Sequence, residues 1–422
     1  MILGCIADDL TGATDLALML SREGLRTLQS TGVPQGETDL SHYDAVVIAL
    51  KSRTIPVKDA IDLSLAACDW LTTHGAERLF FKYCSTFDST DQGNIGPVAE
   101  ALLDRLKSDF TIACPAFPAT GRSIYMGQLF VNGAPLAESP MRDHPLTPMR
   151  DSDLRRVLQK QCTAQVGHVA FNDVDQGAAA IAAAFKREQA AGKRLAIVDA
   201  ITNAHLREIG QAAASLKLIT GGSGIAIGLP EAYRAAGLIK ALANAPARLD
   251  APQGRRAILA GSCSVATRGQ IAAAQKAGLP HFQIDPFAVA DGSCTSDKII
   301  AWVDALPSDA LPLIYSSDDP DHVAKVQEKL GREKAGLLIE HLMATLATRL
   351  GEKGFTRLII AGGETSGAVV EAFGVGLLEI GPEIDPGVPW TKSRSGPHLA
   401  LALKSGNFGA PDFFLKAWDR LS

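Results

Sequence analysis

The chain has 422 residues, which is enough for two domains at about 100–200 residues each. Its composition is that of a globular protein, and its net charge of −5 gives no support to nucleic-acid binding. No apolar run approaches the ~20 residues that span a bilayer, and no basic segment precedes the first apolar run, so we expect no membrane segment and no signal peptide. The seven cysteines are scattered without a CxxC pair, which predicts reduced thiols, a cytoplasmic location and no structural zinc.

The first candidate site lies where the first predicted strand ends. The apolar run 2–7 stops at Asp8 and Asp9, residues 11–14 are predicted as a polar turn, and a helix is predicted from Asp15. The carboxyl ends of parallel strands face the ligand crevice, so two carboxylates there can hold a cation or take a proton from a substrate hydroxyl. The turn hydroxyls and N–H groups can bind an oxyanion. Alternatively, Asp9 or a turn threonine merely caps the helix, which leaves two charges at the end of a buried strand unexplained.

Strand-like and helix-like segments then alternate through the first half of the chain. The strand-like runs after the first one are 44–50, 78–90, 110–117, 194–200 and 217–230. Such alternation predicts a parallel sheet covered by helices.

Charged residues follow the predicted strands of this half or lie in the irregular segment 121–150. Because the carboxyl ends of parallel strands share one sheet edge, we expect them to converge. Cations suit a small carboxylate substrate, which an arginine can clamp in a bidentate manner. His144 alone is equally well explained as a surface residue. The candidates are Asp8, Asp9, Arg53, Lys82, Asp88, Arg122, Arg142 and His144.

The segment 241–256 has no apolar period and contains proline, glycine and charge, so we predict it to be a linker. The domains are then expected at 1–240 and 257–422, and the second again alternates strands and helices. We predict an α/β fold of two domains, each a largely parallel sheet covered by helices, with the active site in the cleft between them.

Three Gly/Ser loops each follow a predicted strand of the second half, at 262–264, 362–367 and 405–409. Glycine lets the backbone approach a ligand closely, and the N-terminus of a following helix suits phosphate. A Walker A loop is excluded because its Gly-Lys-Ser/Thr ending is absent. One such loop is more simply explained as an ordinary turn, but three of them in one domain favour a nucleotide-binding site. These patterns predict that one domain binds an anionic substrate and the other a phosphate donor. This arrangement is typical of a two-domain small-molecule kinase, in which domain closure excludes water and aligns the reactants.

Five motifs, in this order along nearly the whole chain, resemble those of the four-carbon acid sugar kinase family. They are IADDLTGATD at 6–15, PAFPATGR at 115–122, MRDHPLTPMR at 141–150, GGSG at 221–224 and GGETSG at 362–367. The resemblance implies an N-terminal sugar-acid-binding domain and a C-terminal nucleotide-binding domain. It also implies transfer of the ATP γ-phosphate to the terminal hydroxyl of a four-carbon sugar acid. The one difference is Leu10, where many members have phenylalanine.

The resemblance also implies roles for individual residues. Asp8, Asp9, Lys82 and Arg122 would lie on the substrate side, with one of the two aspartates orienting or deprotonating the acceptor hydroxyl. The acceptor would be 3-oxo-tetronate (3-dehydro-erythronate), phosphorylated at its 4-hydroxyl, and Mg²⁺ would bridge the phosphates of ATP. The residues that would contact ATP are Ser262 or Ser264, Gly362, Gly363, Glu364, Thr365 and Gly406.

Three alternatives stay open at this stage. A sister kinase for D-threonate or D-erythronate would have the same layout. A haloacid-dehalogenase-like phosphatase with Asp8 as nucleophile is disfavoured, because that chemistry usually has a second aspartate where this chain has Leu10. A non-catalytic sugar-acid sensor is disfavoured by the Gly/Ser loops of the second half. The sequence leaves the oligomeric state and the metal ligands open.

Overall fold

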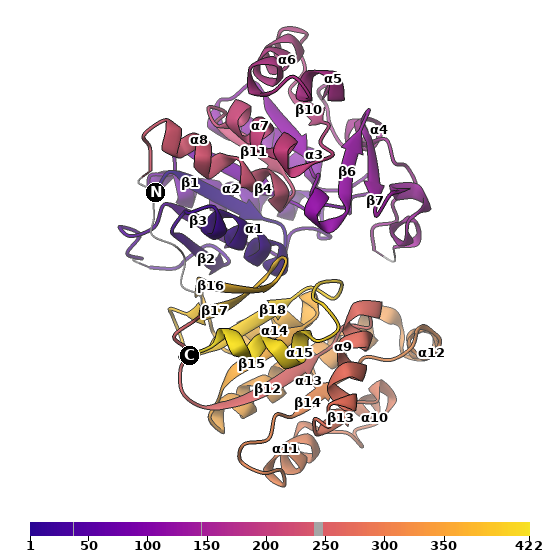
Figure 1. Ribbon diagram of the computed structural model, residues 1–422. Helices are drawn as coiled ribbons and strands as arrows, with labels where there is room; N and C mark the ends of the chain where they lie inside the picture. The colour runs from indigo at the N-terminus through magenta and orange to yellow at the C-terminus, as the bar shows by residue number, and fades with distance from the viewer. Residues whose placement is uncertain (37, 145, 240–247) are drawn as a thin grey trace. The chain divides into compact units, whose positions relative to one another are not determined.

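The structure is a computed structural model that describes residues 1–36, 38–144, 146–239 and 248–422. The chain divides into two compact units, Met1–Asn244 and Ala245–Ser422, each of which is an α/β assembly (Figure 1). Of the predicted linker, residues 241–247 lie outside the described residues, and β12 (Arg255–Ala260) begins before the segment ends. No helix in the described ranges is long and apolar enough to cross a membrane.

The first unit is built on a parallel sheet whose strands lie in the order β2-β3-β1-β4-β11-β5-β10-β9. Their side chains are largely buried because helices cover both faces of the sheet, as the continuous apolar runs predict. The strands are β1 (Leu3–Ala7), β2 (Thr27–Thr31), β3 (Ala45–Ala49), β4 (Arg78–Lys82), β5 (Thr111–Cys114), β9 (Val166–Val169), β10 (Leu195–Val198) and β11 (Leu218–Gly221).

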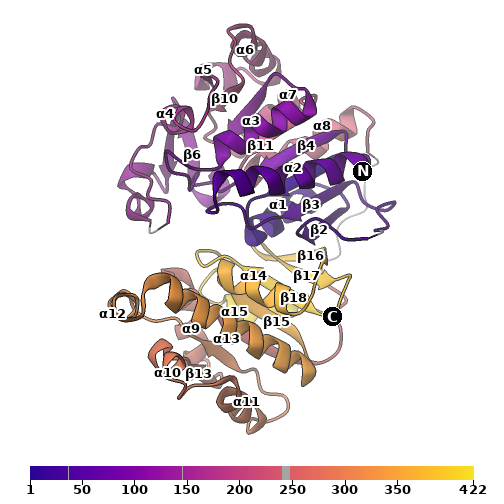
Figure 2. The same cartoon turned by 180° about the vertical axis from the view of Figure 1, so that it is seen from behind.

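Figure 1 shows the face of this sheet that carries α7 and α8, and Figure 2 shows the opposite face with α2 and α3. Helix α1 lies with α7, because both pack against the short 3₁₀ segment Ser223–Ile227. The helices of the unit are α1 (Leu10–Arg22), α2 (Val57–Thr73), α3 (Ile95–Leu106), α4 (Leu154–Gln159), α5 (Phe171–Val174), α6 (Ala178–Ala190), α7 (Asn203–Ala213) and α8 (Leu229–Ala235).

A small antiparallel sheet interrupts this alternation within the irregular segment 121–150. Its strands are β6 (Arg122–Tyr125), β7 (Gln128–Val131) and β8 (Ala134–Pro135). Met126 and Gly127 form the tight turn with φ of 52° and 77°, as a two-residue hairpin loop requires. The buried carboxylate of Asp199 accepts hydrogen bonds from both of their N–H groups, at 2.7 and 2.9 Å. The hairpin is thereby fastened to the end of β10.

The second unit has the strand order β13-β14-β12-β15-β18-β17-β16. The first five strands are parallel, and β17 and β16 are antiparallel additions. Helices α9 and α15 cover one face (Figure 1), and α13 and α14 cover the other (Figure 2). The remaining strands are β13 (His281–Gln283), β14 (Leu313–Tyr315), β15 (Phe355–Ala361), β16 (Leu377–Asp385), β17 (Val388–Ser393) and β18 (Ala400–Lys404). The helices are α9 (Val265–Lys276), α10 (Pro286–Ala290), α11 (Ser296–Asp304), α12 (Pro320–Leu330), α13 (Arg332–Glu352), α14 (Gly363–Ala372) and α15 (Phe413–Lys416).

The prediction of two α/β units with largely parallel sheets is confirmed, but three local predictions are wrong. Helix α1 begins at Leu10 rather than at Asp15, so residues 11–14, which were predicted as a turn, belong to the start of the helix. The run 78–90 is extended only to Lys82. The run 217–230 leaves the sheet after Gly221, because its glycines pack directly against backbone; a Cβ on Gly228 would lie 2.7 Å from the Arg207 carbonyl oxygen.

Candidate active site

A cluster of charged side chains lies at the carboxyl edge of the first sheet. Arg53, in the loop after β3, donates from Nε and Nη2 to the two carboxylate oxygens of Asp8, both at 2.8 Å. Its Nη2 also donates to Asp9 Oδ1 at 2.8 Å. We call Asp8, Asp9, Arg53, Lys82 and Asp88 the Arg53 cluster. The guanidinium therefore holds two carboxylates in a fixed geometry, rather than standing open for a carboxylate ligand.

Asp9 is held by the start of α1 as well. It is the N-cap, accepting from the Gly12 N–H at 3.0 Å and from Thr11 Oγ1 at 2.9 Å. The capping alternative is therefore correct for Asp9, yet capping leaves the carboxylate inside the charged cluster. A Cβ on Gly12 would lie 2.2 Å from Asp9 Oδ1 and 2.6 Å from Lys82 Nζ. Glycine at this position thus makes room for the buried Lys82 beside Asp9.

The loop that carries Arg53 is anchored by a residue that sequence reasoning missed. The amide of Asn94 donates to the carbonyl oxygens of Ser52 at 2.7 Å, Arg53 at 3.2 Å and Ile55 at 3.0 Å. Asn94 precedes α3 and is buried. In the sequence it looks like a helix cap, and only the fold reveals that it satisfies the carbonyls of another loop.

Asp88 reaches the cluster from a strained backbone. Phe87 and Asp88 have φ of 67° and 32°, a left-handed conformation that non-glycine residues rarely adopt. Thr86 Oγ1 donates to Asp88 Oδ1 at 2.6 Å, and Asp88 Oδ2 lies 4.0 Å from Arg53 Nη1. The bend after β4 therefore buries Phe87 and turns the next side chain toward Arg53.

The surroundings of Asp8 and Asp9 shift the pKa values of these two adjacent carboxylates in opposite directions. Burial raises the pKa of Asp8, and the ion pair with Arg53 only partly offsets it. Burial opposes ionisation of Asp9 too, but Arg53, Lys82 and the hydrogen bonds from Thr11 and Gly12 together lower its pKa. The side chain of Asp9 is 28% exposed and that of Asp8 is 7% exposed. Asp9 is thus the ionised carboxylate that an incoming ligand can reach.

Two predicted substrate residues make local contacts instead. Arg122 donates from Nη1 to the Thr120 carbonyl oxygen, and its Nε is buried without a hydrogen-bond partner in the described part of the chain. His144 Nδ1 lies 3.2 Å from the Thr147 N–H and 2.9 Å from its hydroxyl. The first contact lies beside the 3₁₀ segment Pro118–Thr120 and the second joins residues 144 and 147, and neither of these contacts involves a residue of the Arg53 cluster.

In the second unit, the three Gly/Ser loops lie together at one edge of the sheet. They follow β12, β15 and β18, which are neighbouring parallel strands. Ser264 Oγ donates to the Gly406 carbonyl oxygen at 2.5 Å, and a Cβ on Gly406 would lie 2.3 Å from Ser262 Oγ. A Cβ on Gly362, which has φ of 127°, would lie 3.2 Å from the Ser262 backbone nitrogen. The loops form one continuous surface, on which glycine keeps the backbones close.

Two helices begin at this surface. Ser264 caps α9 through the Thr267 N–H, and α14 starts directly after Gly362 with the exposed Glu364 in its first turn. Helix N-termini offer unpaired N–H groups and a positive dipole end, so two of them beside one glycine-rich surface suit a polyphosphate.

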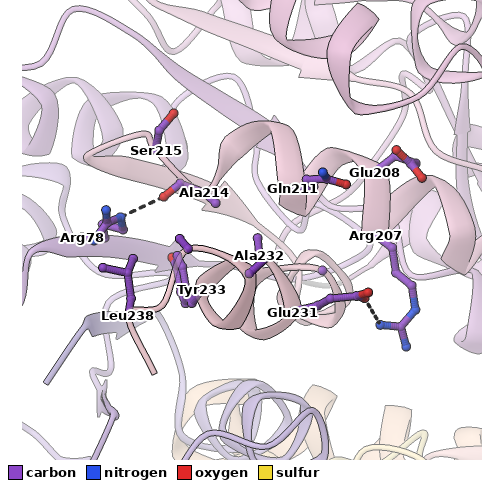
Figure 3. Close-up of a pocket in the computed structure, with 13 residues that line it drawn as sticks. Arg78, Arg207, Glu208, Gln211, Ala214, Ser215, Glu231, Ala232, Tyr233 and Leu238 are labelled. Atoms are coloured by element: carbon purple, nitrogen blue, oxygen red, sulfur yellow. Dashed lines mark hydrogen bonds and ion pairs between the residues drawn. The ribbon is translucent and has the colours of Figure 1, made fainter. Parts of the chain in front are cut away.

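A cavity of the first unit lies elsewhere. It has a volume of about 510 Å³ and is lined by α7, α8 and the start of β4, at the edge opposite to the Arg53 cluster. Its arginines are occupied, since Arg78 Nε donates to the Ala214 carbonyl oxygen and Arg207 pairs with Glu231, as Figure 3 shows, and with Glu23. Unlike the Arg53 cluster, this cavity does not combine adjacent carboxylates with a buried cation, so we place the candidate site at the carboxyl edge.

Comparison with known proteins also divides the chain into two parts, one matched region in each of the two units. Residues 3–229 match the family model described as a sugar-binding N-terminal domain, and residues 257–414 match a nucleotide-binding C-terminal domain. The chain is 53% identical to the 3-oxo-tetronate kinase of Cupriavidus necator, over all of this chain and 97% of that one. It is 44% identical to the 3-oxo-tetronate kinase of Haemophilus influenzae, over 98% of both chains.

Two crystal structures share the fold over the whole chain. A protein of Salmonella typhimurium LT2, described as a candidate tRNA synthase, has a TM-score of 0.87 at 41% identity and covers 100% of this chain and 99% of its own. The Haemophilus influenzae protein HI1011 has a TM-score of 0.79 at 43% identity and covers 99% and 100%. These matches define a protein of two α/β units, one sugar-binding and one nucleotide-binding in type. The chain belongs to the four-carbon acid sugar kinase family.

Proposed function

We propose that this protein is an ATP-dependent kinase that phosphorylates the 4-hydroxyl of 3-oxo-tetronate. The observation that carries the proposal is the presence, in one chain, of a fixed carboxylate cluster and a three-loop phosphate-type surface, in a sequence 53% identical to a 3-oxo-tetronate kinase. The sugar acid would bind to the first unit and the nucleotide to the second.

In this proposal Asp9 orients the 4-hydroxyl and receives its proton. The hydroxyl oxygen attacks the γ-phosphorus, the bond to the β-phosphate oxygen breaks, and ADP leaves. Asp9 suits this role because it is ionised and reachable, while Asp8 is buried against Arg53. Arg53 is then a positioning residue, and Lys82 supplies the positive charge beside the reacting groups.

Three further side chains of the first unit would bind the substrate. Asp88 would accept a hydrogen bond from a substrate hydroxyl, while Arg122 and His144 would bind the carboxylate. The buried Arg122 Nε, which has no hydrogen-bond partner among the described residues, supports the assignment of Arg122 to the carboxylate.

ATP would bind with its phosphates on the loops of the second unit. The residues involved are Ser262, Ser264, Gly362, Gly363, Glu364, Thr365 and Gly406. Mg²⁺ would enter with the nucleotide as part of the MgATP substrate, because Mg²⁺ usually binds through substrate phosphates together with only one or two carboxylates. The chain's own contribution is then to position the reactants and neutralise charge, which is what phosphoryl transfer needs.

The seven cysteines are all free thiols, which supports a reducing, cytoplasmic environment as part of this proposal.

The test is ADP release with a panel of four-carbon acids: 3-oxo-tetronates of both hands, D-threonate, L-threonate and D-erythronate. We expect a clear preference for one 3-oxo acid. A preference for a reduced acid would move the protein to a sister activity, and no turnover with any acid would refute the proposed kinase.

A further inference from the structure

Lys404 is a buried lysine that the mechanism above does not use. It ends β18, directly before the loop 405–409, and its side chain is fully buried. Its Nζ donates to Thr267 Oγ1 at 3.0 Å and to the carbonyl oxygens of Ser405 at 3.0 Å and Gly406 at 3.1 Å. All three acceptors are neutral, which is unusual because buried charges are normally paired with an opposite charge.

The Gly406 carbonyl oxygen is the focus of these contacts. It accepts from Lys404 Nζ at 3.1 Å, from Thr267 Oγ1 at 3.0 Å and from Ser264 Oγ at 2.5 Å. In a trans peptide the N–H of the next residue points away from the carbonyl oxygen. Three donors on one side therefore turn the Asn407 N–H toward the open side of the loop. Within the described ranges that N–H has no protein acceptor, and Asn407 is exposed.

We propose that Lys404 is a positioning residue of the nucleotide site, which locks the Gly406 peptide so that its loop presents N–H groups to phosphate and places a positive charge beneath them. The inference rests on the proposed function, since it assigns the phosphates of the nucleotide to this surface. It goes beyond the three surface loops, because Lys404 acts from inside the sheet and through Gly406 rather than by touching the ligand.

The charge state of Lys404 supplies a signature that packing alone would not. Burial lowers its pKa to about 7. Below that pH the ammonium has three N–H donors for its three acceptors, and above it the neutral amine has only two. A bound polyphosphate favours the ammonium, so nucleotide binding at pH 8 is expected to take up a proton.

Among the residues that the structure describes, no titratable side chain is hydrogen-bonded or ion-paired to Lys404. The hydrogen-bond partners of Lys404 are a hydroxyl and two carbonyls, and neither the described acids nor the described bases form an ion pair with it. The charged side chains on the helices and strands packed against β18 are Arg268 and Lys276 of α9, Arg357 of β15, Glu364 and Glu371 of α14, and Lys392 of β17.

The experiment is calorimetric titration of the full chain with the ATP analogue AMP-PNP and Mg²⁺ at pH 8, in buffers of different ionisation enthalpy. Lys404→Met removes the charge and the donors, and Lys276→Met, an exposed lysine of α9, is the matched control. We expect Lys404→Met to weaken binding about tenfold or more and to reduce proton uptake by roughly half a proton. Lys276→Met should leave both unchanged.

A second variant keeps the test decisive even if Lys404→Met fails to fold. Thr267→Val removes a donor to Gly406 but keeps the lysine, so it should weaken binding while proton uptake persists. If Lys404→Met binds the analogue with wild-type affinity and unchanged proton uptake, the inference is overturned and the proposed kinase is untouched. If the wild-type chain does not bind the analogue at all, both proposals fail.

Discussion

Arg53→Met tests whether the Arg53 cluster is held by a buried ion pair or by ordinary surface contacts. Arg53 makes three hydrogen bonds of 2.8 Å to Asp8 and Asp9, and its loss leaves the carboxylate of Asp8, 7% exposed, without its partner. Removing one partner of a buried pair costs about 3–5 kcal/mol. Because the Arg53 side chain is 24% exposed, we expect the lower limit, about 3 kcal/mol.

The chain contains a matched control in the same unit. Arg26 binds Asp44 through Nε and Nη2 with the same bidentate geometry, at 2.9 and 2.7 Å, but its side chain is 46% exposed. Arg26→Met should therefore cost no more than about 1 kcal/mol. For a unit of this size 1 kcal/mol corresponds to about 2–4 °C in Tm.

Differential scanning calorimetry and urea unfolding of both variants provide the measurement. We expect a decrease of about 6–12 °C in the transition of the first unit for Arg53→Met, and about 4 °C or less for Arg26→Met. Equal decreases would refute the reasoning, because they would show that burial adds nothing to this ion pair. The double variant Arg53→Met/Asp8→Asn should recover part of the loss, since it removes the unpaired buried charge of Asp8.

Three further predictions concern chemistry, backbone space and pH. Asp9→Asn should lower kcat about 100-fold or more at nearly unchanged Tm, whereas Asp8→Asn should lower Tm; near-normal kcat for Asp9→Asn in steady-state kinetics would remove its role. Gly406→Ala should raise KM for ATP at least several-fold, because the new Cβ would lie 2.3 Å from a serine hydroxyl, while Gly269→Ala, with open space around it, should not; equal KM values would contradict the close approach. The pKa of Lys404 is about 7 when folded and about 10.4 when unfolded, so the folded state binds fewer protons between these values and its free energy of unfolding should rise with pH there, by up to about 1.4 kcal/mol per pH unit. Lys404→Met should lack this rise in urea unfolding at pH 7–10, and an identical slope would argue against the lowered pKa.

The sequence predicted those parts of the fold that depend on local pattern. Apolar runs such as 44–50 identified β3, because a short continuous apolar run is typical of a buried strand. The antiparallel direction of β16 and β17 was not among the predictions. Pairing direction depends on the partner strand, which no local pattern contains.

For the candidate site, sequence reasoning identified the residues that end strands and missed those that act through the fold. Asp8, Asp9 and Arg53 could be expected together because parallel strands share an edge. Asn94 and Lys404 could not, because their partners are the carbonyls of loops that are distant in the sequence or turned inward by tertiary packing. A single lysine ending the apolar run 399–403 was the one available signal for Lys404.

Asp9 has two tasks with different chemical requirements. As the N-cap of α1 it needs only an oxygen acceptor, and asparagine meets that need as well as aspartate does. As the proposed proton acceptor it needs a carboxylate. The same position therefore allows the fold to be kept while the reaction is stopped, so Asp9→Asn provides a folded trap in which the sugar acid and ATP can be captured together, unreacted, for crystallography.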